Sequence, residues 1–183
     1  MNYAEGVSIT MPLAANLRLF LNYIYSEGYK MTKDEFKKLC WQLFKEYGFK
    51  KQKKDFVNDG CSNVYCTVDL QKSNYGDAFY INCWFGIKDD HFNDNGPLHA
   101  SDFFNRVQVT SVSMHNNAGN CFETQTILYE DYNVEQMTRY IKAAFEDWVM
   151  PPLQIGGEYV IEHQEKYVFL KRDRDATIRA LLK

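Results

Sequence analysis

The sequence has no long hydrophobic run and no excess of positive charge, and each absence removes a class of function. No segment approaches the roughly 18 apolar residues of a membrane-spanning helix, and the first residues lack the pattern of a signal peptide. We therefore expect a cytoplasmic protein with no membrane partner. The net charge of −3 gives no basic footprint, so we expect no nucleic-acid partner either.

The five cysteines lack the spacing of a zinc site or a disulfide framework. Their number is odd, and no two form a Cys-x-x-Cys pair. Cys40 falls on the apolar side of a predicted helix, whereas Cys66 and Cys83 fall on apolar faces of predicted strands. A reduced thiol in such a place behaves as a small hydrophobic side chain. The pattern is typical of a reducing compartment.

Motifs for catalysis and cofactor binding are also missing. The chain has no nucleophile elbow, no His-Glu-x-x-His zinc motif and no phosphate-binding loop. In loop 89–102, five residues have the spacing of a calcium-binding loop: His91, Asn93, Asn95, Gly96 and Asp102. The first and last of them are not the residue types that such a loop uses as ligands. We predict no catalytic set, no metal site and no cofactor.

What the sequence does contain indicates a globular α+β protein of 183 residues with 45% hydrophobic and 16% aromatic side chains. Thr32 and Glu35 form a capping box that starts a helix over 33–47, and Gly48 ends it. Asn133 with Gln136 starts a second helix over 134–149 in the same way. Both helices have one apolar side and must pack on another element.

Between the helices the pattern predicts an antiparallel meander sheet of four to five strands, with both helices on one face. The predicted strands are 49–57, 63–71, 78–87, 106–115 with a bulge near Thr110-Ser111, and 121–130, with a polar loop over 88–105 and a turn over 116–119. Beyond residue 150 the signals disagree. Residues 159–161 and 167–170 favour strands, whereas 175–182 favours a helix.

The strand side chains that point away from the predicted helices are richer in aromatics than a solvated surface needs. The candidate binding residues on this face are Tyr65, Asp69, Tyr80, Asn82 and Trp84. Tyrosine and tryptophan are favoured where a partner buries a surface. Two interpretations stay open: a ligand or partner uses the face, or loop 88–105 or the C-terminal segment covers it. The lysines at 50, 51, 53 and 54 indicate an exposed strand or a local phosphate-binding patch.

The order of several short motifs is similar to that of a known bacterial family. These are the helix that opens with Phe36, the Tyr47-Gly-Phe-Lys-Lys51 turn, Phe56, Val68-Asp-Leu-Gln-Lys-Ser73 and Phe79-Tyr-Ile-Asn82. Over about residues 31–150 the chain resembles the family catalogued as domain of unknown function 4304. The resemblance implies no activity, cofactor or catalytic residues, because none is established for the family.

Three classes of function remain. We expect a non-enzymatic protein-interaction module, such as an immunity or antitoxin-like protein. A small-molecule binding domain that uses the same sheet face, or an enzyme with an unfamiliar site, is the alternative. The oligomeric state is not predicted.

Residues 1–30 form a possible extension ahead of a single α+β domain over 31–183. They contain few charges, and Glu27-Gly28 lies where a translated ribosome-binding sequence would precede a start at Met31. An authentic helix is the alternative, since Leu13, Leu17 and Leu21 recur at helical spacing. We predict that protein from the native host has the intact mass of a chain that begins at Met31. A mass that begins at Met1 would contradict the hypothesis.

Overall fold

The computed structural model describes residues 30–74, 76–88, 101–109, 112–115, 121–170 and 174–182. Residues Met31–Lys183 form one compact unit. Among the described residues, no helix has the length and hydrophobicity needed to cross a membrane. Several predicted features lie outside the described residues: the helix within 1–29, the calcium-like spacing apart from its last position, Asp102, the bulge at Thr110-Ser111 and the turn over 116–119.

A six-stranded sheet forms the centre of the fold, with the order β1-β2-β3-β4-β5-β8. The strands are β1 (Lys50–Gln52), β2 (Asp55–Asn58), β3 (Val64–Lys72), β4 (Phe79–Ile87), β5 (Phe103–Arg106) and β8 (Val168–Phe169). All neighbouring pairs are antiparallel. The α+β class and the antiparallel arrangement are therefore confirmed, with six strands in place of four to five.

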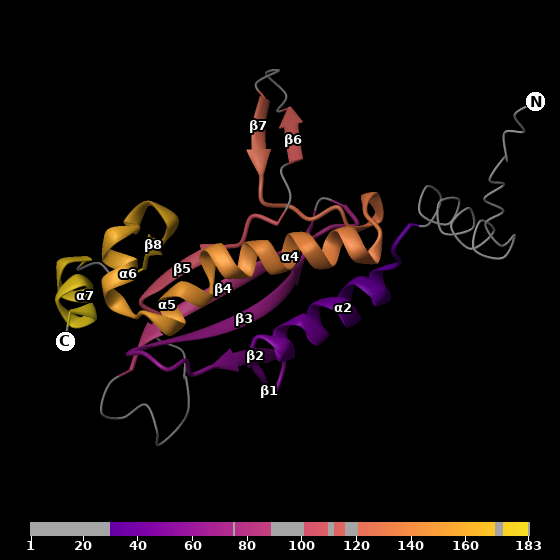
Figure 1. The fold of residues 1–183 in the computed structure, drawn as a ribbon. Helices are drawn as coiled ribbons and strands as arrows, with labels where there is room; N and C mark the ends of the chain where they lie inside the picture. The colour runs from indigo at the N-terminus through magenta and orange to yellow at the C-terminus, as the bar shows by residue number, and fades with distance from the viewer. Residues whose placement is uncertain are drawn as a thin grey trace, which may run out of the picture. The chain divides into compact units, whose positions relative to one another are not determined.

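The two predicted helices, α2 (Lys33–Glu46) and α4 (Val134–Trp148), lie on one face of this sheet (Figure 1). Both capping boxes are present, at Thr32 with Glu35 and at Asn133 with Gln136. Three short helices follow: α5 (Met150–Gln154), α6 (Gly157–Glu162) and α7 (Arg174–Leu181). The 3₁₀ turns are η1 (Tyr129–Asp131) and η2 (Gln164–Lys166).

The core lies between the helices and the sheet. Alternate residues of β3 and β4, among them Cys66 and Cys83, are buried there together with the apolar sides of α2 and α4. Phe44 occupies the middle of this layer, since its ring contacts the rings of Phe49, Phe56 and Phe145. The helices thus cover one face of the sheet. The strand side chains that alternate with the buried ones point to the other face.

The predicted strand 49–57 is wrong, because the segment forms the hairpin of β1 and β2. Phe49 and Phe56 are both buried in the core. They are seven residues apart, so one continuous strand of period two would put them on opposite faces. The chain reverses at Lys53, whose φ of 53° is left-handed, and the reversal lets both rings reach the core.

The segment between β4 and α4 also differs from the prediction. β5 begins inside the predicted polar loop and ends at Arg106, where the fourth strand was expected to begin. Next to β5, an Asp102 carboxylate oxygen accepts a hydrogen bond from the Ile87 backbone at 2.9 Å. The polar residues around Phe103 therefore led to the prediction of a loop where the structure has a strand. β6 (Val112–His115) and β7 (Cys121–Thr124) pair with each other in a separate two-stranded sheet.

Beyond residue 150, the structure decides between the strand and helix preferences of the sequence. Residues 159–161 belong to α6 and not to a strand, while β8 falls within 167–170 and α7 matches the helix expected over 175–182. Gly156, with a φ of 98°, precedes α6. A Cβ atom on Gly157 would lie 2.1 Å from the Leu181 carbonyl oxygen. The close approach of α6 to α7 therefore requires glycine, and this long-range contact is not visible in local residue preferences.

We predict that Phe44→Ala lowers the free energy of unfolding by about 3–5 kcal/mol, because it removes a buried ring and leaves a cavity among three others. Urea denaturation measures the change. Lys38→Ala, an exposed substitution on the same helix, should change stability by less than about 0.5 kcal/mol. Equal losses for the two variants would contradict this account of the core.

Candidate functional site

The candidate site is the outer face, defined as the side chains of β3, β4 and β5 that point away from α2 and α4. The register aligns them in two rows across the strands. Thr67, Trp84 and Phe104 form one row. Asp69, Asn82 and Arg106 form the next row. Cross-strand neighbours on one face lie close enough for direct contact, so these six side chains can act together.

Asp69 is the centre of a hydrogen-bond network on this face. The Trp84 indole Nε1 donates to one carboxylate oxygen at 2.7 Å, and the Asn82 amide donates to the other at 3.0 Å. The Asn82 amide also donates to the Gln71 carbonyl oxygen at 2.9 Å. Both oxygens of Asp69 thus have donors, and the Trp84 ring is held in one orientation.

Arg106 extends the network across the sheet. Its Nε donates to the Asn82 carbonyl oxygen at 3.0 Å, and its guanidinium carbon lies 4.2 Å from the centre of the Tyr80 ring. The Tyr80 hydroxyl accepts a hydrogen bond from Thr126 at 3.3 Å. This bond is the main cause that lowers the pKa of Tyr80, and the positive charge of Arg106 adds to it. Arginine against an aromatic ring is a favourable cation–π arrangement.

A cavity of about 530 Å³ opens beside Asp69 and Trp84. It is lined by Lys54, Asp55, Thr67, Asp69, Leu70, Gln71, Trp84 and Ser101. Trp84 is partly exposed, and its ring centre lies 4.4 Å from that of Phe104. The register that pairs Phe56 with Val68 puts Asp55 next to Asp69. The cavity therefore combines an aromatic wall with two carboxylates and one lysine.

Four of the five residues predicted for this face are joined in the network: Asp69, Tyr80, Asn82 and Trp84. Tyr65 lies apart. It is only 7% exposed, and its ring covers Gly86, where a Cβ atom would lie 2.2 Å from the ring. Tyr65 therefore fills the space that the glycine leaves.

Sequence reasoning missed Gln71, Phe104 and Arg106. Gln71 could have been found, because alternation from Asp69 places it on the same face. Phe104 and Arg106 were not assigned to the face because β5 was expected to be a loop up to residue 105. In the C-terminal segment, Tyr167 and Leu181 belong to the core, and β8 extends the sheet beside β5. Residues 89–100 of the other proposed cover lie outside the described residues.

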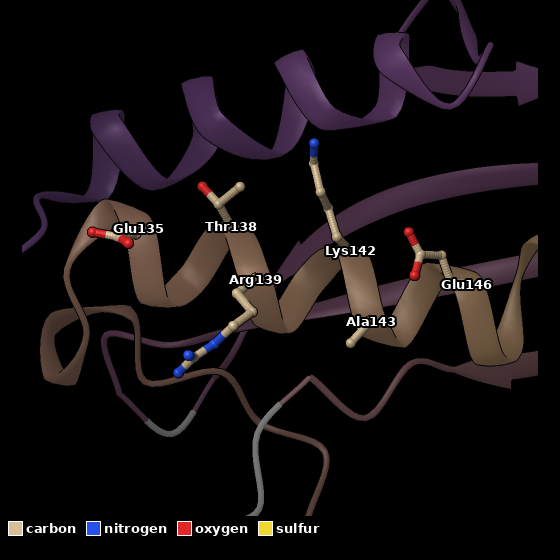
Figure 2. Close-up of a pocket in the computed structure, with 6 residues that line it drawn as sticks. All are labelled: Glu135, Thr138, Arg139, Lys142, Ala143 and Glu146. Atoms are coloured by element: carbon tan, nitrogen blue, oxygen red, sulfur yellow. The ribbon is translucent and has the colours of Figure 1, made fainter.

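A second hollow, of about 620 Å³, follows the exposed side of α4. Figure 2 shows Lys142 extending toward α2 and Arg139 pointing the other way. The Tyr47 hydroxyl donates to Glu146 at 3.1 Å, and Lys142 pairs with Glu46 at 3.2 Å. These contacts join α2 to α4, and burial raises the pKa of Tyr47 to about 12. The polar residues here therefore stabilise the helix pair.

The buried thiols are poor candidates for nucleophilic chemistry. Cys40, Cys66 and Cys83 are fully buried, as their positions on apolar faces predicted. Burial raises the pKa of Cys40 and of Cys66 well above the ordinary value for a thiol. A thiol that stays protonated does not attack a substrate.

Comparison with known proteins gives a match to a family. The family model described as "Domain of unknown function (DUF4304)" matches residues 41–155, which is more than half of the chain. The matched segment contains β1 to β5, α4 and every residue of the Asp69 network. No curated protein and no solved structure matches this chain.

We predict that the Asp69–Trp84 hydrogen bond contributes about 1.5 kcal/mol of coupling energy, because its acceptor is charged. Asp69→Ala removes the acceptor, and Trp84→Phe removes the donor but keeps an aromatic ring. Urea denaturation of both single variants and the double variant gives the coupling. Pairing Trp84→Phe with Thr138→Ala on α4 provides the control, for which additive effects are expected. Additivity of the first pair would contradict the network.

Proposed function

Because this chain belongs to the DUF4304 family, whose description names no activity, its function has to come from its own residues, and we propose that it is a non-enzymatic protein-interaction module that binds its partner through the outer face. The observation that carries the proposal is the Asp69 network. It orders the partly exposed Trp84 and the buried Asn82 by direct hydrogen bonds on the face opposite α2 and α4. The Trp84 and Phe104 rings contact each other at an interplanar angle of 41°, and they supply the aromatic centre that protein interfaces favour.

A preordered surface is suited to binding because less conformational freedom is lost when the partner arrives. The Trp84 ring is held by Asp69, and the Tyr80 ring is held between Arg106 and Thr126. The side chains that would contact a partner are therefore fixed before contact.

The residues that line the cavity support a proposal for the chemistry of the partner. Asp55 and Asp69 border it on adjacent strands, and Trp84 forms a wall. A guanidinium or ammonium group can pair with the carboxylates while its plane or stem lies on the indole. Lys54 also lines the cavity, and its positive charge disfavours the binding of more than one cation. We therefore assign to the cavity one basic side chain of a protein partner.

An immunity or antitoxin-like role is consistent with this partner chemistry. Such a protein binds a toxin and blocks it, and a net charge of −3 favours encounter with a basic protein. The role needs no catalytic residues of its own.

A small-molecule binding domain is the second candidate. The volume of the cavity, about 530 Å³, falls within the usual range of ligand pockets, roughly 300–1,000 Å³. Convergent polar groups beside an aromatic wall are typical of such pockets as well. In this case the ligand would be a small cation.

The proposal predicts a protein cross-link at the outer face. A photo-reactive benzoylphenylalanine at position 104, introduced in the native host, should join to a protein, and mass spectrometry identifies that protein. The purified partner should then bind Trp84→Ala or Asp69→Lys at least about 30-fold more weakly than the unchanged chain, as expected for the centre of an interface.

The control is benzoylphenylalanine at position 134 on α4, where the exposed Val134 should give no cross-link to the same partner. Circular dichroism verifies that the variants are folded. If the Trp84→Ala and Asp69→Lys variants bind the partner as tightly as the unchanged chain does, the protein-interaction proposal is contradicted. A cross-link that adds only the mass of a small molecule would favour the second candidate.

A further inference from the structure

A second surface, which is positively charged where the outer-face cavity carries two carboxylates, lies at the β1 edge of the sheet. Trp41, on the outward side of α2, is 42% exposed although it is a large hydrophobic residue. The Lys51 ammonium group on β1 lies 5.0 Å from the centre of its ring. Lys38 and Lys45 lie one helical turn before and after Trp41, which places them beside it on α2. We call these four residues the Trp41 patch.

The charges of the three lysines in the patch are not neutralised by carboxylates among the described residues. All three are exposed, and none forms an ion pair with a carboxylate of the residues that the structure describes. The nearest acidic residue along the helix from Lys45 is Glu46. Its carboxylate is already bound by Lys142 at 3.2 Å and by the Gln42 amide at 3.0 Å. The positive charge around Trp41 therefore stays available to an external group.

We propose that the Trp41 patch binds an acidic segment of a protein partner, one that is rich in aspartate and glutamate and also carries an aromatic or aliphatic residue. The carboxylates pair with Lys38, Lys45 and Lys51, and the apolar residue covers the exposed indole. Tryptophan is enriched among the residues that dominate binding at interfaces, and the exposed Trp41 ring is the apolar centre of the patch. The patch uses no residue of the outer face, so it is tested independently of the proposed function.

Lysines at a sheet edge have a plainer use, since they keep strands of different molecules from pairing. That use explains Lys50, Lys51 and Lys53, which lie on or beside the edge strand β1. It does not explain Lys38 and Lys45, which lie on a helix, or the exposure of Trp41 between them. The arrangement around an aromatic centre is what distinguishes the patch from a protected edge.

The observations favour a protein segment over a nucleic acid. Binding of a single strand depends on several aromatic rings along a continuous basic groove, and the patch offers one ring and three cations. The chain as a whole has a charge of −3, so a long polyanion that left the patch would meet repulsion. A short acidic segment would not.

The test measures binding of a fluorescein-labelled peptide of repeating Glu-Glu-Phe units to the full chain by fluorescence anisotropy. The variant with Lys38→Gln, Lys45→Gln and Lys51→Gln should bind the peptide at least about tenfold more weakly than the unchanged chain. Added salt should weaken the binding of the unchanged chain. Lys30→Gln, Lys33→Gln and Lys72→Gln remove the same charge elsewhere and should leave the affinity unchanged. Trp41→Ala should also weaken binding, whereas it should not affect a partner bound at the outer face.

A charge swap keeps the result interpretable if a variant is unstable. Lys38→Glu with Lys45→Glu and Lys51→Glu should lose the acidic peptide and gain a peptide of repeating Lys-Lys-Phe units, and a gain of binding requires a folded chain. The proposal is overturned by equal affinity of the patch variant and its control for the acidic peptide. It is also overturned if a single-stranded oligonucleotide of equal charge binds the patch more tightly than the peptide does.

Discussion

Burial of two apolar helix faces against one face of the sheet is the constraint on which the rest of this structure depends. Phe44 of α2 and Phe145 of α4 stack on each other above the sheet, with Phe56 beside them. Once that face is chosen, alternation along β3 and β4 leaves no freedom for the other side chains, because each strand has only two faces. Asp69, Asn82 and Trp84 face outward since their neighbours Val68 and Cys83 face inward.

The features that were predicted correctly from the sequence are those that local chemistry determines. A capping box involves residues three positions apart, and alternation involves residues two positions apart. Both therefore identified α2, α4, β3 and β4. The errors all involve distant contacts. Lys53 reverses the chain because Phe49 and Phe56 must both reach the core, and β5 forms beside β4 although polar residues surround it.

The candidate site follows the same division. Alternation placed Asp69, Tyr80, Asn82 and Trp84 on one face, but it could not show that Asp69 accepts hydrogen bonds from two neighbours. Arg106 was missed because its place in the network depends on the pairing of β5 with β4. Alternation also placed Tyr65 on this face, but it could not show that the Tyr65 ring occupies the space above Gly86, because that contact depends on the strand register.

Net charge alone is a poor guide to the surfaces of this protein, because its charges are segregated. The value of −3 averages a lysine-rich edge at β1 and α2 with carboxylates at the outer-face cavity. Screening limits the reach of each group to about 8–10 Å in physiological salt. A partner therefore responds to the local sign and not to the average. One protein can in this way present a basic patch and an acidic cavity, and on the two proposals made above each would bind a segment of the opposite charge. Aromatic side chains, Trp41 at the patch and Trp84 at the cavity, add an apolar contact that charge alone does not provide.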